Sequence, residues 1–110
     1  MSRIIVAKDF TDTPGTRFRT HGEHSGQEFR ETLLKPKYDA LKPREILEID
    51  FDGTYGYPPS FLEEAFGGLV REIIKEKGNP EEVERKLTFK ADERPDLIIK
   101  VKKFIQNAIS

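Results

Sequence analysis

The feature that most constrains the fold is a strand pattern followed by a helix pattern in the middle of the chain. Apolar and acidic residues alternate over residues 46–51, which predicts a half-buried strand. After a loop rich in glycine and proline, apolar side chains recur at helical spacing, at Phe61, Leu62, Ala65, Phe66, Leu69, Val70, Ile73 and Ile74. This spacing predicts an amphipathic helix that ends at Gly78. Together the two patterns indicate an α/β fold.

The flanking segments extend this order. We expect strands at residues 4–7, 16–20 and 87–89, a helix over residues 26–34, a helical turn at 80–85 and a last helix from Pro95 onward. Ser25 and Glu28 form a capping box that starts the helix at residue 26. Pro36 is expected to end that helix near Lys35, because it disfavours the helical conformation of the preceding residue. The order predicts one α/β domain, residues 1–110, in which helices cover at least one face of a small mixed sheet.

Charge and composition exclude several function classes. With 19 basic and 20 acidic side chains the net charge is −1, which argues against a general nucleic-acid binder. The chain has no cysteine, so disulfides and thiolate chemistry are excluded. Its first residues do not resemble a signal peptide, and no apolar segment is long enough to span a bilayer. We therefore expect a cytoplasmic protein that binds neither nucleic acid nor membranes.

Ser60 is the first candidate functional residue, because it lies between the loop after the best strand and the start of the best helix. Loops at the carboxyl ends of strands are where α/β sheets place function. The alternative is purely structural, since Ser60 and Glu63 form a second capping box. Gly67 and Gly68 interrupt the same helix. They indicate either close packing of the helix or a smooth surface for a partner.

Charged and histidine side chains supply weaker candidates. Acidic residues gather around Ser60, at Asp50, Asp52, Glu63 and Glu64, so a partner docking there is expected to be basic. Arg17, Arg19 and Arg30 could converge on an anion such as phosphate. His21 and His24 have the spacing H-x-x-H, which alone is weak evidence for zinc or catalysis. We expect no metal site and no cofactor.

Several segments resemble the bacterial and archaeal STAS-like family of unknown function, small relatives of the sulphate-transporter and anti-sigma-factor-antagonist domain. The specific segment is residues 52–71, and above all Ser-Phe-Leu-Glu-Glu-Ala-Phe-Gly-Gly-Leu from Ser60 to Leu69. Residues 14–17 and 25–36 add to it, so the resemblance extends over about residues 3–107. It implies a STAS-like fold, with a sheet of about four strands and helices packed mainly on one face.

The resemblance also implies a function. In anti-sigma-factor antagonists a Ser or Thr at the position of Ser60 is phosphorylated by a partner ATPase, and the unmodified form binds that partner. This chain differs in carrying Pro58 and Pro59 just before the site. We therefore expect a non-enzymatic regulatory module whose partner is a histidine-kinase-like ATPase or another regulator. The residues expected to bind the partner are Tyr55, Tyr57, Ser60, Phe61, Glu64, Gly67 and Gly68.

Two alternatives remain open from the sequence. The first is a small-anion or nucleotide-binding domain, with Arg17 and Arg19 as anion ligands and the helix start at Phe61 offering N–H groups. The second is a metal-dependent hydrolase built on Asp50 and Asp52 with His21 or His24. Ligand-induced thermal shifts and phosphoester hydrolysis distinguish these alternatives from a binding module.

Overall fold

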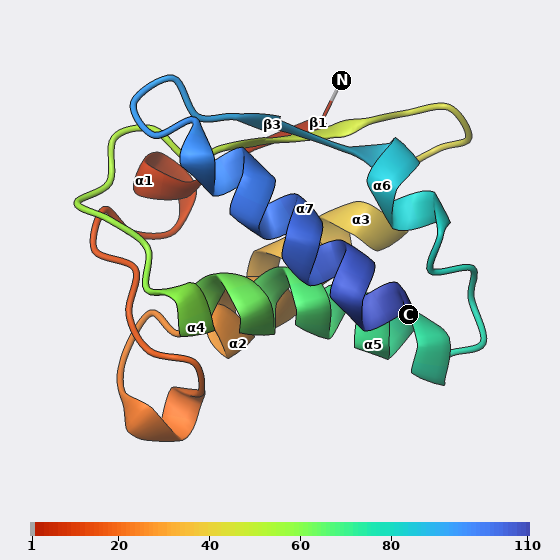
Figure 1. Cartoon of the computed structure of the whole chain (residues 1–110), viewed down its shortest axis with the longest axis horizontal. Coiled ribbons are helices and arrows are strands. Elements are labelled where there is room, and N and C mark those ends of the chain that lie inside the picture. The colour runs from red at the N-terminus through yellow and green to blue at the C-terminus, as the bar shows by residue number, and fades with distance from the viewer. Residues whose placement is uncertain (1) are drawn as a thin grey trace.

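A computed structural model describes residues 2–110 and places three short strands in one parallel sheet (Figure 1). The strands are β1 (Ser2–Ile5), β2 (Leu47–Asp50) and β3 (Leu87–Lys90), in the order β1-β2-β3. Ile4, Ile49 and Phe89 are in register across the sheet. The α/β fold is confirmed, although the sheet has three strands instead of about four and is wholly parallel instead of mixed.

The missing strand is the one expected at residues 16–20. This segment is a loop that ends in a short 3-10 turn, η1 (Arg19–His21). The carbonyls of Thr16 and Arg17 accept hydrogen bonds from the N–H groups of Gly26 and Gln27, at 2.8 and 3.0 Å. These donors belong to the first turn of a helix and lack partners within it. The carbonyls of this segment therefore bind the free N–H groups at the start of the helix that begins at Gly26, and the segment does not join the sheet.

The first strand lies two residues earlier than expected, at Ser2–Ile5 instead of residues 4–7. It ends at Ile5, and residues 6–9 form one helical turn, α1 (Val6–Asp9). The carboxylate of Asp9 accepts a hydrogen bond from the N–H of Ile5 at 2.8 Å. Val6 is fully buried, so the apolar run at residues 4–7 continues into the core as a helical turn.

The first long helix is continuous through Pro36, so the expected end near Lys35 is wrong. It consists of α2 (Gly26–Phe29), the π-helical segment η2 (Arg30–Leu34) and α3 (Lys35–Asp39), and we call it the α2–α3 helix. The N–H of Lys35 bonds to the carbonyl of Arg30, five residues back. A π-helical turn of this kind accommodates a proline, which has no N–H and clashes with the carbonyl four residues back. Ser25 caps the helix as expected, accepting from the N–H of Glu28 at 3.0 Å.

The second long helix confirms the strongest pattern of the sequence. It consists of α4 (Pro59–Leu62), the π-helical segment η3 (Glu63–Gly67) and α5 (Gly68–Lys75), and we call it the α4–α5 helix. It stops three residues before Gly78. The left-handed residue after it is Lys77, with φ of 64°, and the N–H of Gly78 donates to the carbonyl of Ile73 at 2.8 Å.

The helices lie together beneath one face of the sheet (Figure 1). The last part of the chain adds α6 (Glu82–Lys86) and α7 (Asp96–Ile109). Fully buried Leu47 and Ile49 of β2 point into the core, while Glu48 between them faces outward and pairs with Arg3 at 2.6 Å. This arrangement confirms a sheet covered by helices mainly on one side.

Candidate functional site

The loop after β2 lies at the carboxyl end of the parallel sheet and encloses a hollow of about 160 Å³. The residues that line it are Phe51, Asp52, Thr54, Tyr55, Gly56, Tyr57, Glu93, Arg94 and Leu97. They come from the loop after β2, from the segment that joins β3 to α7, and from the first turn of α7 (Asp96–Ile109). The hollow therefore lies where two parallel strands end side by side.

Asp52 joins these two segments. Its carboxylate accepts hydrogen bonds from the N–H groups of Asp92 and Glu93, at 3.2 and 3.0 Å. It also pairs with the ammonium group of Lys90 at 2.8 Å. The hydrogen bond from Lys90 lowers the pKa of Asp52 and raises the pKa of Lys90. Asp52 therefore connects the loop after β2 to the segment after β3 through these hydrogen bonds.

The two tyrosines of this loop have different environments. The Tyr57 hydroxyl donates to the carbonyl of Phe51 at 2.9 Å, and burial raises the pKa of Tyr57. Tyr55 is anchored only through its main chain, whose N–H donates to the carbonyl of Asp12 at 2.9 Å. The Tyr55 side chain is 87% exposed. An aromatic side chain held by a fixed main chain and left in solvent is typical of an anchor for a binding partner.

Ser60 is a half-buried residue in the first turn of the α4–α5 helix. The second capping box is wrong, because the N-cap residue is Pro58 and Pro59 is the first helical residue. Proline suits this position, where its missing N–H costs nothing and its fixed φ matches the helix. The helix start is thus defined by prolines, and Ser60 is not needed to cap it.

Four of the residues expected to bind a partner are buried. Phe61 is fully buried, and Glu64, Gly67 and Gly68 are also covered. Their burial argues against direct contact with a partner in the folded chain, and their predicted role in partner binding stays a prediction. Of the seven expected residues only Tyr55, Tyr57 and Ser60 are accessible in whole or in part.

Gly67 and Gly68 lie where a larger side chain would collide with neighbouring atoms. A Cβ on Gly68 would lie 2.2 Å from Nη1 of Arg30, and a Cβ on Gly67 would lie 2.4 Å from Oε2 of Glu63. Gly68 therefore lets a guanidinium group lie against the helix backbone. Of the two interpretations that the sequence left open, close packing is the one that the contacts support.

From the sequence, Arg30 is predicted only as one of three arginines that could converge on an anion. Its side chain, 9% exposed, donates from Nη1 to the carbonyl and the carboxylate of Glu64, at 2.5 and 2.7 Å, and from Nε to Glu72 at 2.6 Å. The N–H of Gly68 bonds to Glu63 and Ala65 and leaves the Glu64 carbonyl free. The π-helical segment thus supplies the acceptor that Arg30 uses. Its hydrogen bonds to Glu64 and Glu72 outweigh burial and raise the pKa of Arg30.

The arginines expected to bind an anion are paired with carboxylates instead. Arg17 Nη1 lies 2.6 Å from Oε1 of Glu63, and Arg19 Nε lies 2.8 Å from Oε1 of Glu31. Arg30 is held by Glu64 and Glu72 as described. The three guanidinium groups therefore do not converge on a shared site for an anion.

The same ion pairs neutralise the acidic residues around Ser60. Glu63 pairs with Arg71 at 2.7 Å in addition to Arg17, and its pKa is lowered, mainly by the hydrogen bond from Arg71. Glu64 pairs with Arg30, and Asp52 pairs with Lys90. The surface beside Ser60 is consequently less acidic than the sequence suggests, and the expectation of a basic partner loses its support.

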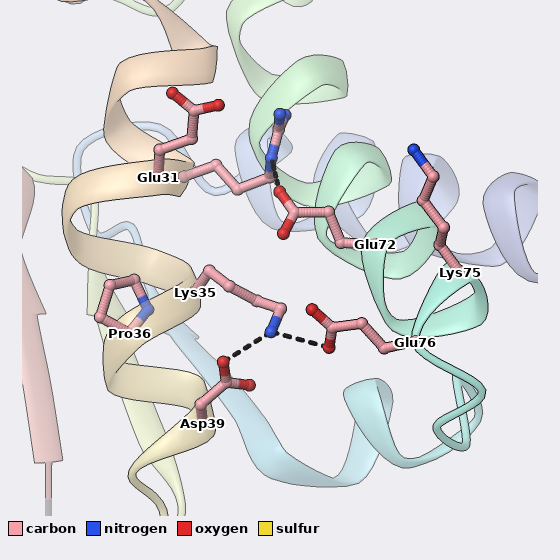
Figure 2. A pocket seen from close by; sticks show the side chains of 8 residues that line it. Glu31, Lys35, Pro36, Asp39, Glu72, Lys75 and Glu76 are labelled. Atoms are coloured by element: carbon pink, nitrogen blue, oxygen red, sulfur yellow. Dashed lines mark hydrogen bonds and ion pairs between the residues drawn. The ribbon is translucent and has the colours of Figure 1, made fainter.

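A larger hollow of about 500 Å³ lies between the two long helices (Figure 2). Figure 2 shows the Lys35 ammonium between Asp39 and Glu76, with distances of 2.5 and 3.0 Å. The hydrogen bonds that Lys35 donates to both carboxylates outweigh burial and raise the pKa of Lys35. Lys35 and Arg30 are the buried cations that line this hollow, and each is already paired with carboxylates. The hollow is therefore lined by salt bridges between the two helices.

The two histidines of the hydrolase alternative contact aromatic rings, whereas its two aspartates bind main-chain N–H groups. The His21 ring packs edge-on against Phe18, and the His24 ring against Phe10, with centroids 5.7 and 5.4 Å apart. Asp50 accepts the N–H of Asp52 at 2.9 Å. Within residues 2–110, no three His, Cys, Asp or Glu side chains are grouped so as to hold a metal ion. In the same range no helix has both the length and the apolar character needed to cross a bilayer.

Comparison with known proteins yields one family. The model of a family described as a STAS-like domain of unknown function matches residues 25–97. This range contains both long helices, β2, β3 and Ser60. No curated protein and no solved structure gives a significant match.

Proposed function

Because the chain belongs to the family of STAS-like domains of unknown function, we propose that it is a non-enzymatic regulatory module that binds a protein partner. The binding site in this proposal is the Ser60 surface, which we define as Phe18, Tyr55, Pro59 and Ser60. The observation that carries it is the 87% exposure of Tyr55, which lies four residues before the start of the α4–α5 helix in the sequence. Phe18 is 38% exposed and Pro59 also faces solvent.

The chemistry of this surface favours a partner that offers an apolar pocket. Exposed aromatic side chains contribute much of the binding energy at protein interfaces, whereas paired surface charges contribute little. The carboxylates near Ser60 are paired with Arg17, Arg71, Arg30 and Lys90. We therefore assign the main contact to Tyr55 and Phe18, and we include Ser60 because it is partly accessible at the start of the helix.

Phosphorylation of Ser60 is the proposed switch, and a histidine-kinase-like ATPase is the proposed partner. In the transfer, the γ-phosphoryl group of a nucleoside triphosphate forms a bond to Ser60 Oγ. The bond from Pγ to the bridging oxygen breaks, the nucleoside diphosphate leaves and the hydroxyl proton is released. The catalytic groups belong to the partner. A phosphate within a largely apolar contact prevents binding, because it must be desolvated there.

Affinity capture from lysate of the source cells tests the proposal with Tyr55→Ala and Ser60→Asp. Both variants are expected to lose the protein that the wild-type chain retains. Ile74→Ala is the matched control, because Ile74 is an exposed apolar residue (46%) near the other end of the same helix. Capture by both variants at the wild-type yield would exclude the Ser60 surface as the binding site.

The small-anion or nucleotide alternative receives less support, because Arg17 and Arg19 pair with different carboxylates and do not form a shared site for a free anion. An increase in the melting temperature of the protein with phosphate or ATP would restore it.

A further inference from the structure

Arg17 is a half-buried cation, 34% exposed, that pairs with two carboxylates of the α4–α5 helix. Its Nη1 lies 2.6 Å from Oε1 of Glu63 and 3.5 Å from Oε1 of Glu64. Both carboxylates have a second arginine. Glu63 pairs with Arg71 at 2.7 Å, and Glu64 pairs with Arg30 at 2.7 Å. Arg17 can therefore leave without creating an unpaired carboxylate.

The main chain of Arg17 is fixed near Ser60. Its carbonyl accepts the N–H of Gln27 at 3.0 Å. The preceding residue in the helix, Gly26, packs so closely against the α4–α5 helix that a Cβ on it would lie 2.4 Å from the carbonyl oxygen of Phe61. Phe61 follows Ser60 directly. The Arg17 side chain thus starts beside the first turn of this helix and extends along it to Glu63.

Ser60, Glu63 and Glu64 are spaced so that their side chains lie along one side of the helix. Residues three and four apart on a helix are neighbours, with Cβ atoms about 5–6 Å apart. A guanidinium group that reaches Glu63 and Glu64 from a main chain near Phe61 can rotate about its side-chain bonds toward residue 60. A phosphate carries a charge of about −1.5 to −2 and competes well with a single carboxylate for arginine.

From this geometry we infer that Arg17 is the receptor for a phosphoryl group on Ser60 and exchanges Glu63 for the phosphate when Ser60 is modified. The inference rests on the modification step of the proposed function, and it identifies the residue that reads the modification. It does not depend on which partner supplies the phosphate.

The exchange also has a consequence for the Ser60 surface. The Arg17 guanidinium lies 5.9 Å from the centre of the Phe18 ring, a cation–π distance. Moving the guanidinium toward Ser60 removes this contact from Phe18, which is part of the Ser60 surface. The switch therefore acts on one of the aromatic anchors as well as placing charge in the contact.

The test uses the full chain with phosphoserine incorporated at position 60 during translation, so that neither a kinase nor a partner is needed. Phosphorus NMR across a pH titration measures the second pKa of the phosphate. With Arg17 present this pKa is expected to be about 1 unit lower than in the Arg17→Gln variant, because a neighbouring cation favours the more highly charged form. Arg19→Gln is the matched control, because Arg19 lies on the same loop and pairs with Glu31. In this variant the second pKa of the phosphate should equal that of the phosphorylated chain without a substitution.

Equal phosphate pKa values with and without Arg17 would overturn the inference. If Arg17→Gln does not fold, the NMR signal of Arg17 Nε–H in the chain without substitutions tests the same inference. It should shift between the Ser60 and phosphoserine forms, and an unchanged signal would also overturn the inference. Neither result bears on partner capture by the unmodified chain, so the two proposals fail separately.

Discussion

Gly67 and Gly68 show how neighbouring residues of one type can have different structural roles. A Cβ on Gly68 meets the guanidinium of Arg30, which is 9% exposed and held by Glu64 and Glu72. A Cβ on Gly67 meets the end of the Glu63 side chain, which is 25% exposed and can move. Arg30 is buried and cannot move aside, whereas Glu63 is partly exposed and can shift together with the surface arginines that bind it.

We expect Gly68→Ala to lower the free energy of unfolding by about 2–3 kcal/mol, because it displaces Arg30 and leaves Glu64 buried without its cation. Gly67→Ala is the matched control and should change the stability by less than about 1 kcal/mol, since the better helix propensity of alanine offsets the shift of Glu63. Urea denaturation measures both. Equal stabilities of the two variants would contradict this account of Gly68.

At the scale of elements, the loop before the α2–α3 helix is held against the α4–α5 helix by charge. Arg17 of the loop and Arg71 of the helix both bind Glu63, and the hydrogen bonds from Arg71 and Arg17 lower the pKa of Glu63 below its ordinary value of 4.5. In the unfolded chain Glu63 recovers its ordinary pKa. The carboxylate therefore stabilises the fold at any pH above about 4.5, and the contribution is lost as the pH falls through the lower pKa of the folded state.

The expected result is that the free energy of unfolding of the wild type falls between about pH 5 and pH 3, and that Glu63→Gln makes this fall smaller. Both chains are compared by denaturation at pH 7, 5, 4 and 3. The difference should be modest, because Glu63 is a quarter exposed and solvent weakens the pair. A pH dependence identical in the two chains would show that this pair does not contribute.

For the whole molecule, one three-stranded sheet is covered by helices mainly on one face. The aromatic rings of Phe51, Phe66 and Phe89 join the carboxyl end of the sheet to the α4–α5 helix, with centroids 5.8 to 5.9 Å apart. Ile49 lies in the central strand between Ile4 and Phe89. A core shared by every layer predicts that the chain unfolds in one cooperative step.

Ile49→Ala is expected to cost about 2–5 kcal/mol and to keep a single transition, because it removes a fully buried side chain from the shared core. Glu48→Ala, one residue earlier on the open face, should cost less than about 1 kcal/mol, since its partner Arg3 is half exposed. Circular dichroism and tyrosine fluorescence during urea unfolding measure both variants. Separate transitions by the two probes would argue against a shared core.

The sequence by itself determined the α/β class, the central strand and the helix after it, because apolar periodicity and turn residues act over a few neighbouring positions. It also located Ser60 at the start of that helix. The family follows from the match of residues 25–97 to its model. Only the tertiary structure decided which neighbours are accessible: it buried Phe61, Glu64, Gly67 and Gly68 and left Tyr55 in solvent. It also paired Arg17 with Glu63 across 46 positions and carried a helix through Pro36 by a π-helical turn. Contacts of this range depend on how whole helices pack, and no local pattern specifies them.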